Sequence, residues 1–410
     1  PARMVLGRDC LAVAAGGAQS SRTTAKAGES RVTLAVMSEP THAVPPSRPP
    51  AVPRADYLVW AKRRPHPAND LGRSDVVACT LADLPGAREA LELTGRNDEG
   101  WEPLVHRVAA RYGVRPDQVA TATGTSGANF LVCAALLRPG DDVLIEQPAY
   151  DPLLAVPALL GANVLRFERR FEEGFRLDLD RVAAALTPRT RLIVVTNPHN
   201  PTGVLTGADD LRALGALAER HGCAVLADEI YLDAVPGVTP PAAATLSPRI
   251  ITTASLTKAY GLAGLRCGWA LADTAICEEI RRARDLVDGS GSVLAERTAA
   301  IAFDRLPELA ARARAILAPN FERFEAFMAG QPSLDWVVPA GGTVAFPRLR
   351  ARVSADALAD RLLRDFDTAV VPGRFFQAPA HFRVALGIPE DDLERGLDAI
   401  GRALRLDGRS

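Results

Sequence analysis

Short runs of apolar and β-branched residues alternate with stretches of helical period between about residues 118 and 272. The runs are apolar throughout, as expected for strands that helices cover on both faces. This alternation favours an α/β fold with three layers around a mostly parallel sheet. The predicted strands are Gln118–Ala122, Asp142–Ile145, Asn163–Phe167, Arg191–Thr196, Cys223–Ala227, Ile250–Ala254 and Gly268–Leu271, and the helices between them include Ala128–Leu137, Asp178–Leu186 and Asp209–His221.

The pattern changes after Gly289. A helical region is expected from about 293 to 329. Shorter helices and strands follow it, including a strand over Thr343–Leu349, which is typical of an α+β domain. A chain of 410 residues is also long enough for two domains. The sequence therefore predicts four segments: a disordered extension rich in Ala, Ser, Thr, Arg and Pro (1–55), a segment that joins the small domain (56–95), a large α/β domain (96–290) and a small α+β domain (291–410).

Charge and cysteine content exclude several classes of function. The net charge is −1 and no long basic run occurs, so no nucleic-acid or anionic-membrane partner is expected. No apolar run is long enough to span a bilayer. The six cysteines form no C-x-x-C pair and no Cys/His cluster with zinc spacing. We therefore expect no metal site, and free thiols in a reducing cytoplasm.

Polar residues follow four of the predicted strands. In open α/β sheets ligands bind outside the carboxyl ends of the strands, so these residues are expected at one rim of the sheet. The four segments are Thr123–Gly127, Asn197–Gly203, Asp228–Tyr231 and Ser255–Trp269.

The first two segments are ambiguous when each is taken alone. Gly124, Thr125 and Ser126 lead into a helix, and a glycine before a helix N-terminus suits a phosphate. Taken alone, however, this segment favours a tight turn with a Ser/Thr cap over phosphate binding. In the second segment two prolines restrict the chain and hold Asn200 rigidly, whereas His199 is assigned no role.

The other two segments place charged residues after buried strands. Burying Asp228 is expensive unless the carboxylate meets a cation or donors, and a structural salt bridge satisfies that need too. Lys258 also follows a buried strand, where the pKa of a lysine shifts readily and where Schiff-base nucleophiles occur. Ser255 and Arg266 flank Lys258 and can bind an anion.

The segment around Lys258 resembles the lysine signature of the class I/II aminotransferases, which are fold-type I pyridoxal-phosphate enzymes. Cys267 departs from this signature, because an aliphatic residue is usual there. The resemblance covers about residues 56 to 405, with the four segments in family order. The matching residues are Ser255, Leu256, Thr257, Lys258, Gly261, Leu262, Gly264, Arg266 and Gly268.

The resemblance implies pyridoxal 5'-phosphate as the cofactor. Lys258 would hold it as a Schiff base and shuttle the α-proton, and Asp228 would pair with the ring nitrogen. By the same resemblance, Asn200 and Tyr231 would bond to the ring hydroxyl, and Tyr150 would stack on the ring. Arg383 would bind the substrate carboxylate. The phosphate would be held by Gly124, Thr125, Ser126, Ser255 and Arg266.

The sequence departs from the family pattern near the expected substrate. Many relatives carry a tyrosine just before the segment that matches Gly100–Leu104, and here Trp101 is the nearest aromatic residue. Covering the site and packing in the core are equal alternatives for Trp101. Asp75 stands where a glycine often approaches the substrate, and it either favours a polar or cationic substrate or faces water. The loop Asp288–Val293 lacks the arginine of relatives that prefer dicarboxylates.

These features predict a cytoplasmic aminotransferase of amino acid metabolism, a homodimer that moves an amino group from an L-amino acid to a 2-oxo acid. The alternative is another pyridoxal-phosphate reaction on the same fold: a β-elimination lyase, or a cyclising or replacing synthase in amino-acid-derived biosynthesis. The cofactor performs the hard step in each case, and the protein selects the bond that breaks. A ligand-sensing regulator is disfavoured, because residues 1–55 show no helix-turn-helix pattern.

Overall fold

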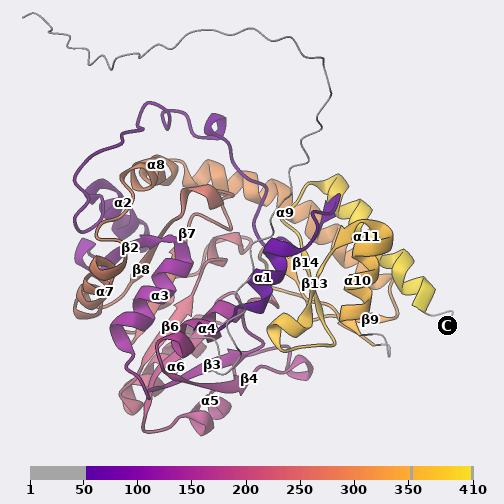
Figure 1. Ribbon diagram of the computed structural model, residues 1–410, viewed down its shortest axis with the longest axis horizontal. Coiled ribbons are helices and arrows are strands. Elements are labelled where there is room, and N and C mark those ends of the chain that lie inside the picture. Colours follow the sequence, from indigo (N-terminus) through magenta and orange to yellow (C-terminus); the bar gives the residue numbers. More distant parts are fainter. Residues whose placement is uncertain (1–51, 351–353, 408–410) are drawn as a thin grey trace, which may run out of the picture. The chain divides into compact units, whose positions relative to one another are not determined.

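The computed structural model describes residues 52–350 and 354–407, so most of the predicted extension lies outside the described residues. A central sheet has the strand order β2-β8-β7-β6-β5-β3-β4 (Figure 1). Strand β8 is antiparallel to both neighbours and the other pairings are parallel. The mostly parallel α/β sheet is therefore confirmed. Its strands are β2 (Val119–Thr123), β3 (Asp142–Gln147), β4 (Asn163–Glu168), β5 (Thr190–Thr196), β6 (Ala224–Asp228), β7 (Ile250–Ser255) and β8 (Cys267–Leu271).

Helices cover both faces of this sheet, because its strands are apolar on both sides. Val143 and Ile145 of β3 pack on one face with α3, α4 and α7, whereas Leu144 packs on the other with α5 and α6. Helices α2 and α8 cover that second face at the β2–β8 edge. The helices are α2 (Glu102–Tyr112), α3 (Gly124–Leu136), α4 (Asp151–Leu159), α5 (Leu179–Ala185), α6 (Ala208–His221), α7 (Thr274–Val287) and α8 (Val293–Phe303).

The predicted strands of the sheet shift by no more than two residues at either end, and three other differences are larger. Helix α3 begins at Gly124, so the expected phosphate segment forms its first turn. The helical region after residue 293 is divided into α8 and α9 (Leu306–Ala329), and Pro307 lies in the first turn of α9, where a missing N–H does no harm. The strand expected over 343–349 is split into β10 (Val344–Ala345) and β11 (Arg348–Leu349).

The remaining elements form short sheets and helices. Strand β1 (Asn69–Asp70) pairs with β12 (Thr368–Ala369), so the segment before the large sheet contacts the last third of the chain. The predicted domain boundaries near residues 95 and 290 stay a prediction. Among the described residues, no helix combines the length and apolarity that crossing a membrane requires. The other elements are α1 (Asp56–Arg63), β9 (Leu334–Asp335), α10 (Ala355–Phe366), β13 (Val371–Pro372), β14 (Phe382–Ala385) and α11 (Glu390–Asp407).

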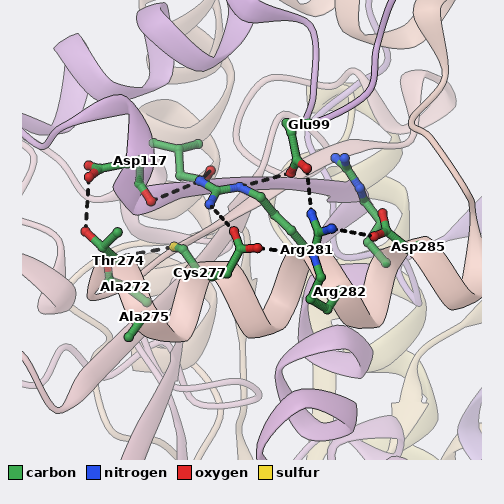
Figure 2. A network of polar contacts seen from close by, with 12 residues as sticks. Glu99, Asp117, Ala272, Thr274, Ala275, Cys277, Arg281, Arg282 and Asp285 are labelled. Atoms are coloured by element: carbon green, nitrogen blue, oxygen red, sulfur yellow. Dashed lines mark hydrogen bonds and ion pairs between the residues drawn. The ribbon is translucent and has the colours of Figure 1, made fainter.

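A polar network ties α7 to the edge of the sheet and to the segment before α2 (Figure 2). The buried Arg281 guanidinium donates to the backbone carbonyls of Asp117 and Val119, at 2.9 Å each. Arg282 pairs with Glu99 at 2.5 Å. These contacts fix the loop that precedes Trp101.

Candidate active site

A cavity of about 220 Å³ lies at the carboxyl ends of the parallel strands, where open α/β sheets bind ligands. Side chains of all four segments singled out in the sequence line it, together with Tyr150 and a residue near the C-terminus. The predicted residues that the structure brings together here are Thr125, Ser126, Tyr150, Asn200, Asp228, Tyr231, Lys258, Arg266 and Arg383.

Lys258 follows strand β7, and its amine reaches into the cavity. The Nζ atom donates a hydrogen bond to Ser74 Oγ at 2.8 Å. Burial lowers the pKa of Lys258 to about 8, with the nearby Arg383 and Arg266 acting in the same direction and Asp75 opposing them. A substantial fraction of such an amine is neutral near pH 7 to 8, so it can act as a nucleophile and as a base.

Asp228 is the last residue of β6 and lies at the base of the cavity. Its Oδ2 accepts a hydrogen bond from Asn129 Nδ2 at 2.8 Å, and its Oδ1 accepts one from the Ile230 N–H at 3.2 Å. Burial raises the pKa of Asp228 to about 6, although these donors and the Lys258 charge favour the ionised form. The carboxylate is therefore negative at neutral pH and suits a cationic ring nitrogen.

The sequence did not single out Asn129, which positions Asp228. Thr253 Oγ1 donates to Asn129 Oδ1 at 2.6 Å, and this bond leaves the amide N–H₂ directed to the carboxylate. The available signal was a polar residue within the apolar stretch of helix α3.

The N-terminus of α3 and the Arg266 guanidinium form a cradle for an anion. Gly124 has a φ of +70°, and a Cβ there would lie 2.5 Å from Arg266 Nη2. The hydroxyl of Thr125 is buried and has no hydrogen-bond partner among the described residues. Free donors and a helix N-terminus beside an arginine suit a phosphate.

Arg383 of β14 is buried and faces the cavity without a carboxylate partner among the described residues. It donates to Asn200 Oδ1 at 3.1 Å and to the Tyr57 hydroxyl at 2.7 Å, and its Nε has no partner there. An arginine held in this way suits the carboxylate of a substrate. Tyr57 comes from α1, in a part of the sequence too poorly patterned to place it.

His199 holds the loop that carries Asn200. Its ring nitrogens lie 2.7 Å from Thr202 Oγ1 and 2.9 Å from the Pro148 carbonyl oxygen. Burial lowers the pKa of His199 well below its usual value, so the ring stays neutral. The ring is buried, joins two loops and does not line the cavity.

Three tyrosines, Tyr57, Tyr150 and Tyr231, line the cavity together with Asn200. The rings of Tyr150 and Tyr57 meet edge to face, with centroids 5.8 Å apart. Tyr231 is 5% exposed, and burial raises its pKa to about 12, so its hydroxyl is a donor at neutral pH.

Four predicted site residues do not line the cavity. Gly124 lies beneath Arg266, and the Ser255 hydroxyl accepts a hydrogen bond from the Thr257 N–H at 3.3 Å. Trp101 packs against the core, with the Arg297 guanidinium 5.0 Å from its ring centroid. Asp75 lies beside the cavity, paired with an arginine, and its side chain is only 15% exposed.

The sequence matches the family "Aminotransferase class I and II" over residues 97–400. The chain belongs to this family, whose members depend on pyridoxal phosphate. The cavity fits that cofactor, because its free donors suit a phosphate, its buried carboxylate suits a ring nitrogen, and its lysine has a lowered pKa.

Relatives in the family catalyse more than one reaction. The chain is 36% identical over 369 residues to capreomycidine synthase of Streptomyces vinaceus, covering 87% of this chain and 95% of that protein. It is 31% identical over 288 residues to arginine–pyruvate transaminase AruH of Pseudomonas aeruginosa, and the match covers 69% of this chain and 73% of that protein. A crystal structure of the PLP-dependent cyclase OrfR matches 88% of this chain and 100% of its own, with a TM-score of 0.78 and 28% identity.

Covalent capture of the cofactor by the cofactor-free protein is expected to accelerate as the pH rises through about 8, since only the neutral Lys258 amine is nucleophilic. The rate is expected to level off above that pH, whereas an unperturbed lysine, with a pKa of about 10.4, would give a continuing rise. Stopped-flow absorbance measures this profile. An Asp75→Asn variant shifts the midpoint to lower pH, because the Asp75 charge raises the pKa of Lys258.

Proposed function

We propose that this protein is a pyridoxal-phosphate-dependent cyclase that closes a ring on an amino acid by replacing a group at Cβ. One observation carries the proposal: the chain covers 95% of capreomycidine synthase at 36% identity. The likeness to the cyclase OrfR, which extends over that whole chain, supports it independently.

The reaction requires a substrate with a leaving group on Cβ and a nucleophilic nitrogen in its side chain. When bound, pyridoxal phosphate supplies the electron sink that stabilises negative charge at Cα. Lys258 Nζ would take the proton from Cα and later return it to Cα. The bond from Cβ to the leaving group would break as the side-chain nitrogen bonds to Cβ, and the proton that this nitrogen loses would balance the one that departs with the leaving group. The product is the substrate minus one molecule of HX, so no oxidant or 2-oxo acid is consumed.

The other cavity residues bind and orient in this proposal. Asp228 pairs with the ring nitrogen, and Asn200 and Tyr231 donate to the ring hydroxyl. Arg383 holds the substrate carboxylate, which turns Cα towards Lys258. The phosphate donors are Thr125, Ser126 and Arg266, with the N–H groups of the first turn of α3.

Transamination is the second candidate. The likeness to arginine–pyruvate transaminase favours it, as does a Streptococcus suis PLP-dependent aminotransferase structure with a TM-score of 0.82 and 26% identity. The same lysine would return the proton to a different atom, and a 2-oxo acid would accept the amino group.

Product analysis separates the two reactions. The holoenzyme is incubated with L-amino acids that carry a hydroxyl or chlorine on Cβ and a side-chain nitrogen, and the products are weighed by mass spectrometry. A cyclase gives the substrate minus HX without added pyruvate. Stoichiometric formation of alanine from pyruvate establishes transamination instead, and ammonia with an acyclic 2-oxo acid establishes a lyase.

The homodimer, the role in amino-acid-derived biosynthesis and the cytoplasmic location are proposals too, supported by family membership. Sedimentation of the holoenzyme tests the first, since a dimer would sediment at about twice the chain mass of 43.6 kDa.

A further inference from the structure

We propose that the Asp75 carboxylate binds a cation on the substrate side chain, and that Arg73 pairs with this carboxylate when no substrate is bound. The inference deepens the proposed function by naming the class of substrate: amino acids with a guanidinium or ammonium group at the end of the side chain. It rests on that function only in taking an amino acid as the ligand.

The backbone of Asp75 is held firmly beside the reactive lysine. The Val76 N–H donates to the Lys258 carbonyl at 3.0 Å, and the Thr343 hydroxyl donates to the Ser74 carbonyl at 2.6 Å. A Cβ on Gly387 would lie 2.5 Å from the Asp75 carbonyl oxygen, so a glycine is needed for this close approach. Asp75 is therefore presented from a fixed segment.

The carboxylate of Asp75 lies near the amine of Lys258. The residue before it, Ser74, accepts a hydrogen bond from Lys258 Nζ at 2.8 Å. Burial opposes the ionisation of Asp75, but the charges of Lys258 and Arg73 lower its pKa below the usual value. Asp75 therefore carries a negative charge at neutral pH beside the lysine, where the Cα of a bound amino acid would lie.

Arg73 pairs with Asp75 through contacts that a ligand can replace. Its Nε lies 3.3 Å from Oδ1 and its Nη2 lies 3.2 Å from Oδ2, both longer than the 2.7–2.9 Å typical of strong charged bonds. The Arg73 side chain is 47% exposed, whereas that of Asp75 is 15% exposed. Arg73 can therefore swing into water, while the carboxylate stays in place.

The arrangement of charge in the site fits a cationic side chain. Arg383 supplies the positive group for the substrate carboxylate. Among the described residues, one carboxylate lines the cavity, that of Asp228, and it is buried and already bonded to Asn129 and the Ile230 N–H. Asp75, which lies beside the cavity, is thus the carboxylate whose partner can be exchanged. The partner of Asp75 in the structure is the Arg73 guanidinium, so a guanidinium group fits beside this carboxylate.

The test compares binding of L-arginine and L-citrulline to the holoenzyme by calorimetry. Citrulline has nearly the shape of arginine but no charge. The wild-type protein is expected to bind arginine about 10- to 100-fold more tightly than citrulline, which is the usual contribution of a hydrogen bond to a charged group. In Asp75→Asn this ratio is expected to fall to about 1–3, because the amide keeps the shape and loses the charge.

Two further variants sharpen the test. Arg73→Gln removes the internal competitor, so arginine binding is expected to tighten several-fold while citrulline binding stays unchanged. Asp83→Asn removes an exposed carboxylate of the same segment that bonds to Thr80, and it is expected to keep the wild-type ratio.

Three results would overturn the inference. The first is an equal loss of affinity for arginine and for citrulline in Asp75→Asn, which would mean that Asp75 acts only on the position of Lys258. The second is weaker arginine binding in Arg73→Gln. The third is a wild-type ratio near 1. The ratio of the affinities for arginine and citrulline does not depend on which bond the enzyme breaks. If product analysis contradicts the cyclase proposal, this binding test still decides the inference about Asp75.

Discussion

Replacing Lys258 with alanine is expected to abolish covalent capture of the cofactor and to lower turnover by at least about 10³-fold, because one side chain supplies both the nucleophile and the base for the α-proton. The variant is expected to fold, since the Nζ atom makes its hydrogen bond to Ser74 inside a cavity rather than in the packed core. Absorbance spectra with added cofactor and assays of turnover measure the two effects.

The sequence offers a well-matched control for this variant. It contains three lysines, Lys26, Lys62 and Lys258, and Lys62 is an exposed residue of α1. Lys62→Ala is expected to leave both capture and turnover unchanged. Borohydride reduction followed by peptide mass spectrometry should label Lys258 in the wild type. A label on another lysine, or spectra of Lys258→Ala identical to those of the wild type, would refute the assignment.

The central sheet was predictable because each strand carries a local signal. A run such as Arg191–Thr196 is apolar on both faces, and it ends where the polar segment with Asn200 begins. The rule that ligands bind at the carboxyl ends of strands then brings distant segments to one cavity. Lys258 and Asp228 were identified in this way, and the cavity contains both.

The parts of the site that the sequence did not predict come from contacts between distant segments. Tyr57 bonds to Arg383, which lies 326 positions away along the chain, and no periodic pattern encodes such a contact. Ser74 reaches Lys258 only because the extended segment around Asp75 is held by several backbone bonds. Trp101 was ambiguous for the same reason: its environment is set by Arg297 and Glu296 of α8.

In our proposals, contacts between distant segments set the selectivity of the site for its substrate, whereas the residues of the local motifs carry out the reaction. The residues around Lys258 and Asp228 suit any reaction that removes the α-proton of an amino acid. The segment before β2 adds Asp75, which distinguishes one substrate from another in our proposal, and Tyr57, which accepts a hydrogen bond from Arg383. Relatives with different names for their reactions can therefore resemble this chain over most of its length.

Replacing Asp228 with asparagine is expected to lower turnover by about 10²- to 10⁴-fold, which corresponds to the roughly 3–5 kcal/mol lost when one partner of a buried ion pair is removed. The asparagine would leave the ring nitrogen of the cofactor without its negative partner, so negative charge at Cα would be stabilised less. Lys258 is unchanged in this variant. Covalent capture and its absorbance band should therefore persist, which separates this variant from Lys258→Ala.

Asp142→Asn is the matched control for Asp228→Asn. Asp142 is also buried, but it lies at the opposite end of the sheet, where it accepts hydrogen bonds from Thr187 at 2.6 Å and Asn163 at 3.0 Å. This control is expected to lose stability, seen as a lower melting temperature, and to keep the turnover of its folded fraction. If the folded fractions of the two variants lose turnover equally, or if Asp228→Asn loses less than about threefold, then the Asp228 carboxylate does not act on the reaction, because the loss of an ion-pair partner is far larger.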